Sequence, residues 1–568
     1  MTKRIFVSCD AAALSMGAEA VATAVQNEIV SRRLDAKLVR NGSRGMLWLE
    51  PLLEVETAEG RVGYGPVTPA DVSLQGWIVL PGDPEYDKDR QLFNPVFDVY
   101  PVMIVYCVVE TDVAIALQLA QEFVLPFTVR SGGHCTAGFS AGFGVLIDVS
   151  NLNDATVDSA TRIATVGTGC AFSKLDATLA GYGLHVPGGE CPDVCVGGYM
   201  QGGGYGFTSV TFGMNCDNVI DMRVMLADGS IITARESVNC YLWWAMRGGT
   251  GGNFGIVLSV RYRLVPLQQA FGWALIWALQ TPTDIGNATN ALMTLQAQYM
   301  GPNLPTELNI QVSLCFQPGI TADATAGLPQ QPYLMVRGLY VGTQAQGQAA
   351  IQALCNLPGA VLQWTEMATF SQLNTDLLNK PYGMPYLPPD ASMPCEDKAS
   401  RYVSVPLSAD QWTALLGLYV QAPNPITYFY MEFYGGAINT YPRYPQMGNA
   451  FVHRTSAYNA VMDVFWYDDT QRQAAQAFLQ QWMDLMAPLW NGEIYQNYPR
   501  LNEPNYAQAY WGDAQAGLYA VKCKYDPGHA FTFAQEVPPL MPPGHGIEPV
   551  IILPQWLQDA LSQPIVRD

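Results

Sequence analysis

The chain has 568 residues, more than one hydrophobic core normally supports, so two or three domains are expected. Hydrophobic residues make up 49% of it and charged residues only 14%, which is typical of packed globular proteins and excludes a disordered chain. The 49 acidic residues outnumber the 29 basic ones and give a formal net charge of −20. Such a surface repels phosphate backbones, so nucleic acid is not an expected partner.

The first residues do not read as a secretory signal. Lys3 and Arg4 precede a short apolar run that Asp10 interrupts, whereas a signal needs a longer uninterrupted core. No apolar segment reaches the length of a membrane-spanning helix, so no membrane partner is expected. Twelve cysteines are too few for a disulfide scaffold in a chain of this size. We therefore expect a cytoplasmic protein whose thiols are mostly reduced.

Residues 1–77 form the first predicted unit, a small α/β appendage. Short runs of strand-favouring residues predict strands at 5–7, 36–40, 53–57 and 61–64. The Ala-rich run 11–30 has the apolar spacing of a helix.

Three segments of this unit resemble the thioredoxin-like N-terminal part of bacterial NAD-dependent formate dehydrogenase beta subunits. They are Arg40–Gly45, Trp48–Leu52 and Tyr64–Thr68. The nucleotide and iron–sulfur motifs of that family are not visible later in the chain. The unit is therefore expected to be a structural appendage or a docking surface for a protein partner.

Four further segments follow. Strand and helix patterns alternate through residues 78–268, and residues 269–490 favour an antiparallel sheet backed by helices, which makes a second domain. Residues 491–535 are rich in Tyr, Asn and Pro, and residues 536–568 are expected to be an extended tail.

Two glycine-rich stretches are candidates for cofactor contact. Ser131-Gly132-Gly133 follows a predicted strand, and bare backbone amides in such a turn can bind a pyrophosphate, although an ordinary tight turn explains the same residues equally well. Gly202–Gly206 lacks the compact βαβ setting of a dinucleotide fingerprint, so nicotinamide binding is rejected.

A histidine and a cysteine stand beside these stretches. His134 could be a ligand, a base or a capped surface residue on sequence grounds alone. Cys191 and Cys195 have C-x-x-x-C spacing, but no second cysteine pair or histidine cluster completes a zinc site, so no metal is expected.

The order of nine motifs over residues 78–535 resembles the berberine bridge enzyme-like branch of the vanillyl-alcohol-oxidase flavoproteins. The motifs are Arg130–Cys135, Cys191–Gly206, Asp217–Ile220, Trp244–Gly249, Gly252–Val257, Tyr434–Gly436, His453-Arg454, Tyr495–Tyr498 and Lys524–Pro527. The resemblance implies an α+β protein in which a two-subdomain FAD-binding domain carries an antiparallel-sheet substrate domain, with residues 491–535 returning to the FAD domain.

The resemblance also implies covalently bound FAD. His134 matches the residue bonded to the flavin 8α-methyl, and Cys191 matches the residue bonded to C6. Val194 matches the position that gates oxygen access, where a small valine favours an oxidase over a dehydrogenase. The other positions expected to contact the cofactor are Arg130, Ser131, Gly132, Gly133, Cys135, Gly197, Gly198, Tyr199, Gly203, Tyr205, Gly252, Ile256, Tyr495 and Asn497.

The resemblance assigns the catalytic base to Tyr498, with a tyrosine that merely packs on the flavin edge as the alternative. A phenol with a pKa near 10 needs a neighbouring cation or donor to act as a base. Arg454, Arg500 and Lys522 are candidates that the sequence cannot place.

A second acid is offered by Glu432. Some members of the family use a glutamate as the base, and the resemblance places Asn459 at that position. In the strand 428–434, residues 428, 430, 432 and 434 share one face by two-residue alternation. Three tyrosines and Glu432 on one face predict a substrate wall, with a solvent-exposed sheet face as the alternative.

These features together predict an oxidase with FAD attached through His134 and Cys191. It would take a hydride, onto flavin N5, from an alcohol carbon or a carbon next to nitrogen of a bulky substrate such as a saccharide or secondary metabolite, and O2 would be reduced to H2O2. The alternatives are a dehydrogenase or oxidative cyclase of a biosynthetic pathway, and a partner-docked electron-transfer protein.

Overall fold

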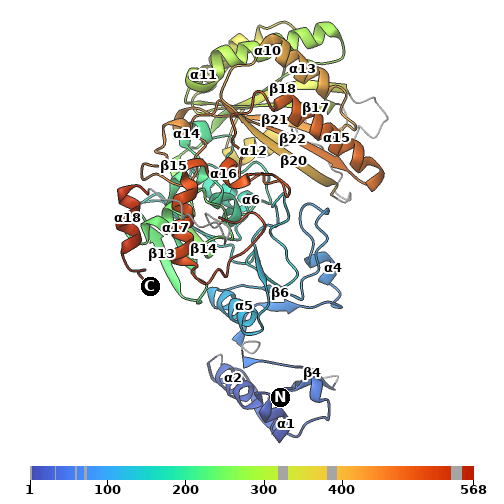
Figure 1. Cartoon of the computed structure of the whole chain (residues 1–568), viewed down its shortest axis with the longest axis vertical. Coiled ribbons are helices and arrows are strands. Elements are labelled where there is room, and N and C mark those ends of the chain that lie inside the picture. The colour runs from blue at the N-terminus through green and yellow to red at the C-terminus, as the bar shows by residue number, and fades with distance from the viewer. Residues whose placement is uncertain are drawn as a thin grey trace, which may run out of the picture.

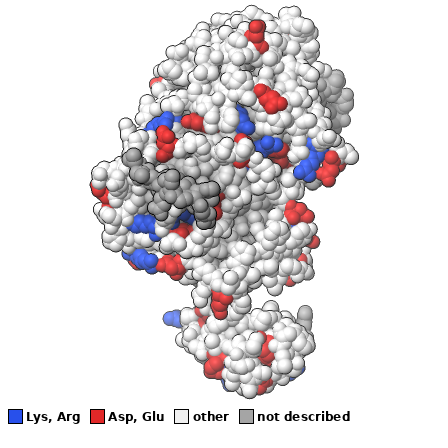
Figure 2. Space-filling model, viewed as in Figure 1, with Lys and Arg blue, Asp and Glu red and all other residues white. Residues whose placement is uncertain are grey.

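The computed structural model describes residues 3–31, 33–57, 60–69, 73–317, 331–379, 393–538 and 553–568. A small unit lies at one end of the molecule, a mixed domain occupies the middle, and a helix-backed sheet forms the other end (Figure 1). On the face shown in Figure 2, most Lys and Arg side chains lie close to Asp or Glu, and broad areas are uncharged. In the described part of the chain, no helix combines the length and apolarity needed to cross a bilayer.

The N-terminal unit is a four-stranded sheet in the order β2-β1-β3-β4. Its strands are β1 (Lys3–Ser8), β2 (Ala36–Asn41), β3 (Leu53–Thr57) and β4 (Gly60–Tyr64). The single helix expected at 11–30 is instead two, α1 (Ala11–Ser15) and α2 (Ala18–Ser31), because Gly17 adopts a φ of 99° that no helix continues through. The strands and the α/β character agree with the sequence prediction.

The middle domain contains two larger sheets and a two-stranded one, in which β11 (Leu184–His185) pairs with β15 (Val265–Pro266). In the first, ordered β5-β6-β8-β7, the strands β6 (Met103–Tyr106), β8 (Val145–Asp148) and β7 (Phe127–Arg130) are parallel, and β5 (Trp77–Val79) is an antiparallel edge. The second is antiparallel in the order β13-β12-β14-β10-β9. Its strands are β9 (Ala155–Asp158), β10 (Ile163–Gly167), β12 (Val219–Met225), β13 (Ile231–Arg235) and β14 (Ile256–Arg263).

The third body is a seven-stranded antiparallel sheet in the order β19-β16-β18-β17-β21-β22-β20. The strands are β16 (Ala270–Ala278), β17 (Leu308–Gln317), β18 (Gln331–Tyr340), β19 (Val361–Ala368), β20 (Cys395–Val403), β21 (Tyr428–Phe433) and β22 (Tyr458–Trp466). Figure 1 shows helices covering its outer face: α10 (Pro282–Tyr299), α11 (Gln344–Cys355), α13 (Ala409–Tyr419) and α15 (Asp469–Met486).

Strand alternation gives this sheet two different faces. On β21, Phe429, Met431 and Phe433 belong to the large apolar core that includes the helices of the outer face. Tyr428 and Tyr430 belong to a separate cluster on the opposite face. The sheet thus turns an apolar face to its helices and a polar, tyrosine-rich face to the middle domain.

The C-terminal tail differs from the expected extended segment. Residues 555–562 form helix α18 (Gln555–Ser562), whose Leu557 and Ala560 are buried. The Trp556 ring lies 5.7 Å from that of Trp244, so α18 is anchored on the middle domain. The physical reason is amphipathicity: apolar residues three apart face the domain, and the polar positions between them remain outside.

Candidate active site

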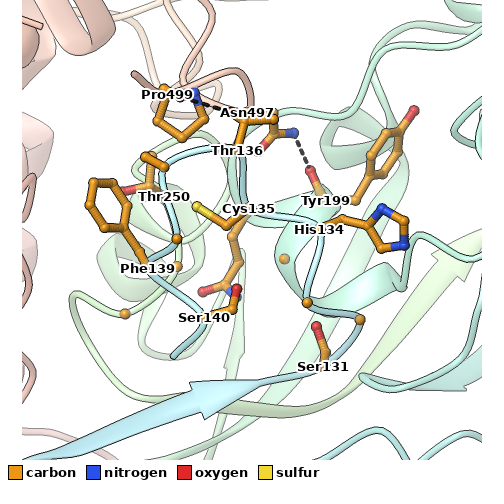
Figure 3. A pocket seen from close by; sticks show the side chains of 18 of the residues that line it. Ser131, His134, Cys135, Thr136, Phe139, Ser140, Tyr199, Thr250, Asn497 and Pro499 are labelled. Atoms are coloured by element: carbon orange, nitrogen blue, oxygen red, sulfur yellow. Dashed lines mark hydrogen bonds between the residues drawn. The ribbon is translucent and has the colours of Figure 1, made fainter. Parts of the chain in front are cut away.

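A cavity of about 620 Å³ lies between the middle domain and the polar face of the seven-stranded sheet. Figure 3 shows part of its wall, where the turn carrying Ser131, His134 and Cys135 lies near Tyr199 and Asn497. The predicted site residues that line it are Ser131, Gly132, Gly133, His134, Cys135, Cys191, Val194, Gly197, Gly198, Tyr199, Tyr205, Gly252, Ile256, Tyr495, Asn497 and Tyr498.

The glycine turn after β7 leaves bare backbone at the cavity wall. Gly133 has a φ of 71°, which favours glycine, and a Cβ on Gly132 would lie 3.0 Å from both the Cys195 backbone nitrogen and its Sγ. Arg130, which precedes the turn, was expected at the cofactor but does not line the cavity. Its guanidinium is instead buried in an ion pair with Asp148, because a buried charge needs a partner.

His134 and Cys191 line the same cavity from two different loops. The His134 ring stacks on Phe93 with centroids 4.5 Å apart, and burial lowers the pKa of His134 to about 4. Burial, together with the charge of Glu190, raises the pKa of Cys191 to about 12. At neutral pH the structure therefore holds a neutral imidazole and a protonated thiol at the cavity wall.

In the run 202–206 only Tyr205 lines the cavity, and Gly202 makes room for the C-terminal segment. The Tyr495 hydroxyl accepts hydrogen bonds from the amides of Gly204, at 2.9 Å, and Tyr205, at 3.1 Å. A Cβ on Gly202 would lie 2.0 Å from Asn497 Oδ1. Gly203 was expected at the cofactor but does not line the cavity, since this run is where the C-terminal segment docks on the middle domain.

Gln201 contributes to the cavity wall a buried polar atom that has no partner in the described part of the chain. Gln201, at the end of α7 (Val196–Gln201), donates from Nε2 to the Gly197 carbonyl at 2.8 Å, whereas its Oε1 is buried and accepts no hydrogen bond from the described residues. Such an atom is costly unless a ligand satisfies it. The unpartnered oxygen, the bare glycine turn and a cavity of about 620 Å³ fit a large polar cofactor such as FAD. Sequence analysis missed Gln201 because nothing local marks it.

Tyr498 and Glu432 meet beside this cavity. The Tyr498 hydroxyl donates to Glu432 Oε1 at 2.6 Å, and Asn459 Nδ2 donates to Glu432 Oε2 at 3.0 Å. Burial, reinforced by the charge of Glu190, raises the pKa of Glu432 to about 8. Burial also raises the pKa of Tyr498 well above 10, so its phenol is neutral at physiological pH.

The strand containing Glu432 forms only part of the expected wall. Tyr428 and Tyr430 line the cavity, whereas Tyr434 lies beyond the end of β21. Its hydroxyl bonds that of Tyr402 at 2.8 Å, and its ring stacks on Tyr205. Two of the four positions, Tyr428 and Tyr430, therefore form the expected wall, and Glu432 lies behind it, bonded to the cavity-lining Tyr498.

None of the three cations considered for Tyr498 pairs with it in the structure. The partners of Arg454, Arg500 and Lys522 are Asp217, Asp397 and Asp526 respectively. The cation beside Tyr498 is Lys398, whose Nζ lies 4.8 Å from the ring centroid. Sequence analysis missed Lys398, although the i, i+2 pair Glu396-x-Lys398 within a strand-like run was a usable signal.

Among the described residues, no group of three His, Cys, Asp or Glu side chains is arranged to hold a metal ion. All twelve cysteines are free thiols. Cys195, considered with Cys191 for zinc, instead contacts the Gly169 carbonyl through Sγ at 3.3 Å.

Comparison with known proteins supports an FAD site. Residues 101–235 match the FAD binding domain family, and residues 494–538 match the family described as berberine and berberine like. An uncharacterised FAD-linked oxidoreductase of Bacillus subtilis is 28% identical over 475 residues, covering 82% of this chain and 98% of that protein. A carbohydrate oxidase of Microdochium nivale is 27% identical over 500 residues, covering 82% and 93%.

The fold agrees with these sequence matches. The structure of BBE-like 1 from Physcomitrella patens superposes with a TM-score of 0.71 at 23% identity, covering 83% of this chain and 98% of that one. The matched FAD-binding region carries the glycine turn with His134, and the matched C-terminal region carries Tyr495, Asn497 and Tyr498. The chain therefore contains an FAD binding domain and a berberine-like C-terminal segment, and it is an FAD-linked oxidoreductase similar to berberine bridge enzyme-like proteins.

Proposed function

We propose that the protein is an FAD-dependent oxidase that oxidises an alcohol carbon of a saccharide-type substrate and reduces O2 to H2O2. The observation that carries the proposal is the Tyr498–Glu432 hydrogen bond of 2.6 Å beside the cavity that contains His134 and Cys191. The similarity to the carbohydrate oxidase of Microdochium nivale supports a saccharide over other bulky alcohols.

Tyr498 and Glu432 together can remove a substrate proton. The phenol of Tyr498 is neutral, so it accepts the proton of a substrate hydroxyl only while passing its own to Glu432. The Glu432 carboxylate suits this role because burial brings its pKa to about 8, close to the pH at which it must accept a proton. Asn459 holds the second carboxylate oxygen and so fixes the orientation of Glu432.

Bound FAD would supply the acceptor for the hydride that leaves the carbon. His134 and Cys191 would hold it by two covalent bonds, since both line the cavity and the His134 ring is neutral. Two bonds fix a cofactor without enclosing it, which leaves the face toward Tyr428 and Tyr430 for a bulky substrate. Val194 would leave O2 a path, because its small side chain lines the same cavity.

The test is oxygen uptake by the purified holoenzyme with cellobiose and xylobiose. The proposal predicts uptake of O2 with formation of one H2O2 per sugar oxidised. Sugar oxidation that proceeds only with an added electron acceptor would instead establish a dehydrogenase. If neither sugar bleaches the flavin, the saccharide assignment is overturned.

A further inference from the structure

A buried cluster of three charged residues lies at the substrate side of the cavity. Lys398 on β20 is directly opposite Asp463 on β22, and Tyr428 on β21 is opposite Asp463 in turn. The Lys398 ammonium lies 3.1 Å from Glu396 Oε1 and 3.2 Å from Asp463 Oδ2. All three charged side chains line the cavity that also contains Tyr498.

The cluster is only half satisfied by the protein. Glu396 and Asp463 are each only 5% exposed. Even so, Glu396 Oε2 and Asp463 Oδ1 accept no hydrogen bond from the described residues. A buried carboxylate oxygen without a hydrogen-bond donor costs more free energy than a buried neutral acceptor without one. Two such oxygens on either side of one ammonium form a prepared site for a ligand with hydrogen-bond donors.

The chemistry of the cluster favours hydroxyl groups on a neutral molecule. An anionic ligand group would be repelled by the Glu396 carboxylate. A cationic group would be repelled by the Lys398 ammonium, which lies 3.1 Å from Glu396 Oε1. The Lys398 ammonium already pairs with carboxylate oxygens of both Glu396 and Asp463, so it has no unbalanced positive charge to attract an anion. A hydroxyl both donates and accepts, and can therefore bond a carboxylate oxygen and the ammonium at once.

Aromatic side chains complete the surroundings. Tyr428, Tyr430 and Phe465 line the cavity beside the cluster, and the Lys398 ammonium lies 4.8 Å from the Tyr498 ring. Apolar ring faces suit the C–H faces of a sugar, whose hydroxyl edges then reach the polar groups. The cluster is therefore adjacent to the Tyr498–Glu432 pair and on the same polar face of the sheet.

We propose that Glu396, Lys398 and Asp463 form a specificity subsite that binds adjacent hydroxyl groups of a neutral saccharide next to the reacting hydroxyl. This inference rests on the proposed function, because it assigns the site that would select its substrate. It adds that sugars with charged substituents at this position are disfavoured.

Binding to the reduced holoenzyme separates this subsite from catalysis. Enzyme whose flavin has been reduced anaerobically with dithionite cannot oxidise a sugar, so isothermal titration with cellobiose, xylobiose, glucosamine or glucuronate measures affinity alone. We expect the neutral disaccharides to bind more tightly than the charged sugars. Glu396→Gln and Asp463→Asn, which each present an amide in place of a free oxygen, should each weaken disaccharide binding by about tenfold or more.

Asp397→Asn is the matched control. Asp397 lies between Glu396 and Lys398 on β20, but it pairs with Arg500 and does not line the cavity, so disaccharide affinity should be unchanged. Flavin content and Tm report whether each variant is folded, and either of the two subsite variants alone decides the question.

The outcomes separate the two proposals. Disaccharide binding that is absent in the wild type, or unchanged in folded Glu396→Gln and Asp463→Asn, would overturn the subsite even if the enzyme oxidises sugars. Glucosamine binding that exceeds disaccharide binding, and falls in the variants, would also overturn it in favour of a cation site. Disaccharide binding that falls in the variants while the wild type shows no sugar oxidation would support the subsite and refute the oxidase.

Discussion

The Tyr498 hydroxyl donates to Glu432 Oε1 at 2.6 Å, which joins the C-terminal segment 491–535 to strand β21 of the seven-stranded sheet. The sequence assigned the base to Tyr498, activated by a neighbouring cation or donor, with Glu432 as a second acid. The structure instead couples Tyr498 to the Glu432 carboxylate, which changes the expected chemistry from a phenolate base to a proton relay. The pH dependence of the reaction follows from that difference.

We predict that kcat/KM rises with pH, from about pH 6 to about pH 9, with its midpoint near the Glu432 pKa of about 8. Only the ionised carboxylate can accept a proton, and its folded-state pKa is raised, so the active form increases as pH rises through 8. A steady-state pH profile with a saccharide substrate measures this. A flat profile over that range would contradict the role of Glu432.

Replacing the carboxylate gives the corresponding control. Glu432→Gln keeps a hydrogen-bond acceptor for Tyr498 but cannot take its proton, so kcat/KM should fall by about 10²- to 10⁴-fold and lose the rise near pH 8. Glu503→Gln alters a buried carboxylate that pairs with Arg401 outside the cavity lining. It should keep the wild-type profile.

The proposed covalent attachment of FAD through His134 and Cys191 can be tested on denatured protein. Wild-type protein should keep its flavin after denaturation and precipitation, and His134→Ala and Cys191→Ala should each keep it through the remaining bond. The double variant should release all of it. Fluorescence of the flavin in a denaturing gel distinguishes these cases, and release from the wild type would refute covalent attachment.

We predict that the size of the side chain at position 194 sets the rate at which O2 reoxidises the reduced enzyme. Val194→Ile adds one methylene at the cavity wall, so it should slow reoxidation of the reduced enzyme by O2 through a narrower path. Anaerobic reduction by the sugar should be unaffected. Stopped-flow measurement of each half-reaction tests this, and equal reoxidation rates would remove Val194 from the oxygen path.

The buried ion pair between Arg454 and Asp217 marks a position where a substitution should strongly lower the free energy of unfolding. Arg454 donates to both carboxylate oxygens of Asp217, at 2.6 and 2.8 Å, and both side chains are nearly fully buried. Asp217→Ala would leave the guanidinium buried and unpaired, which should cost about 3–5 kcal/mol of the free energy of unfolding. Arg567→Ala removes an exposed pair with Asp228 and should cost about 0–1 kcal/mol. Thermal unfolding of both variants compares the two costs.

Local sequence features predicted much of the fold and part of the site. The turn 131–134 and the strand alternation at 428–432 depend on residues close together in the chain, which is why they could be predicted. The family resemblance is confirmed by the matches to the FAD binding domain and to the berberine-like segment.

The missed and misplaced residues depend on long-range pairing. Lys398 faces Asp463 only because β20 and β22 pair in that register, and strand register between distant segments cannot be read from one sequence. Gly203 does not line the cavity, because Tyr495, about 290 residues away, docks on its run. Arg130 does not line it either, because its guanidinium pairs with Asp148 on a neighbouring strand.

The most direct test of the central claim is anaerobic single-turnover reduction of the bound flavin by a saccharide, in the wild type and in Tyr498→Phe. Phenylalanine keeps the ring but removes the hydroxyl that bonds Glu432. The account predicts that flavin bleaching slows by about 10²- to 10⁴-fold, while sugar binding to the dithionite-reduced enzyme is retained. Bleaching by Tyr498→Phe at the wild-type rate would contradict it.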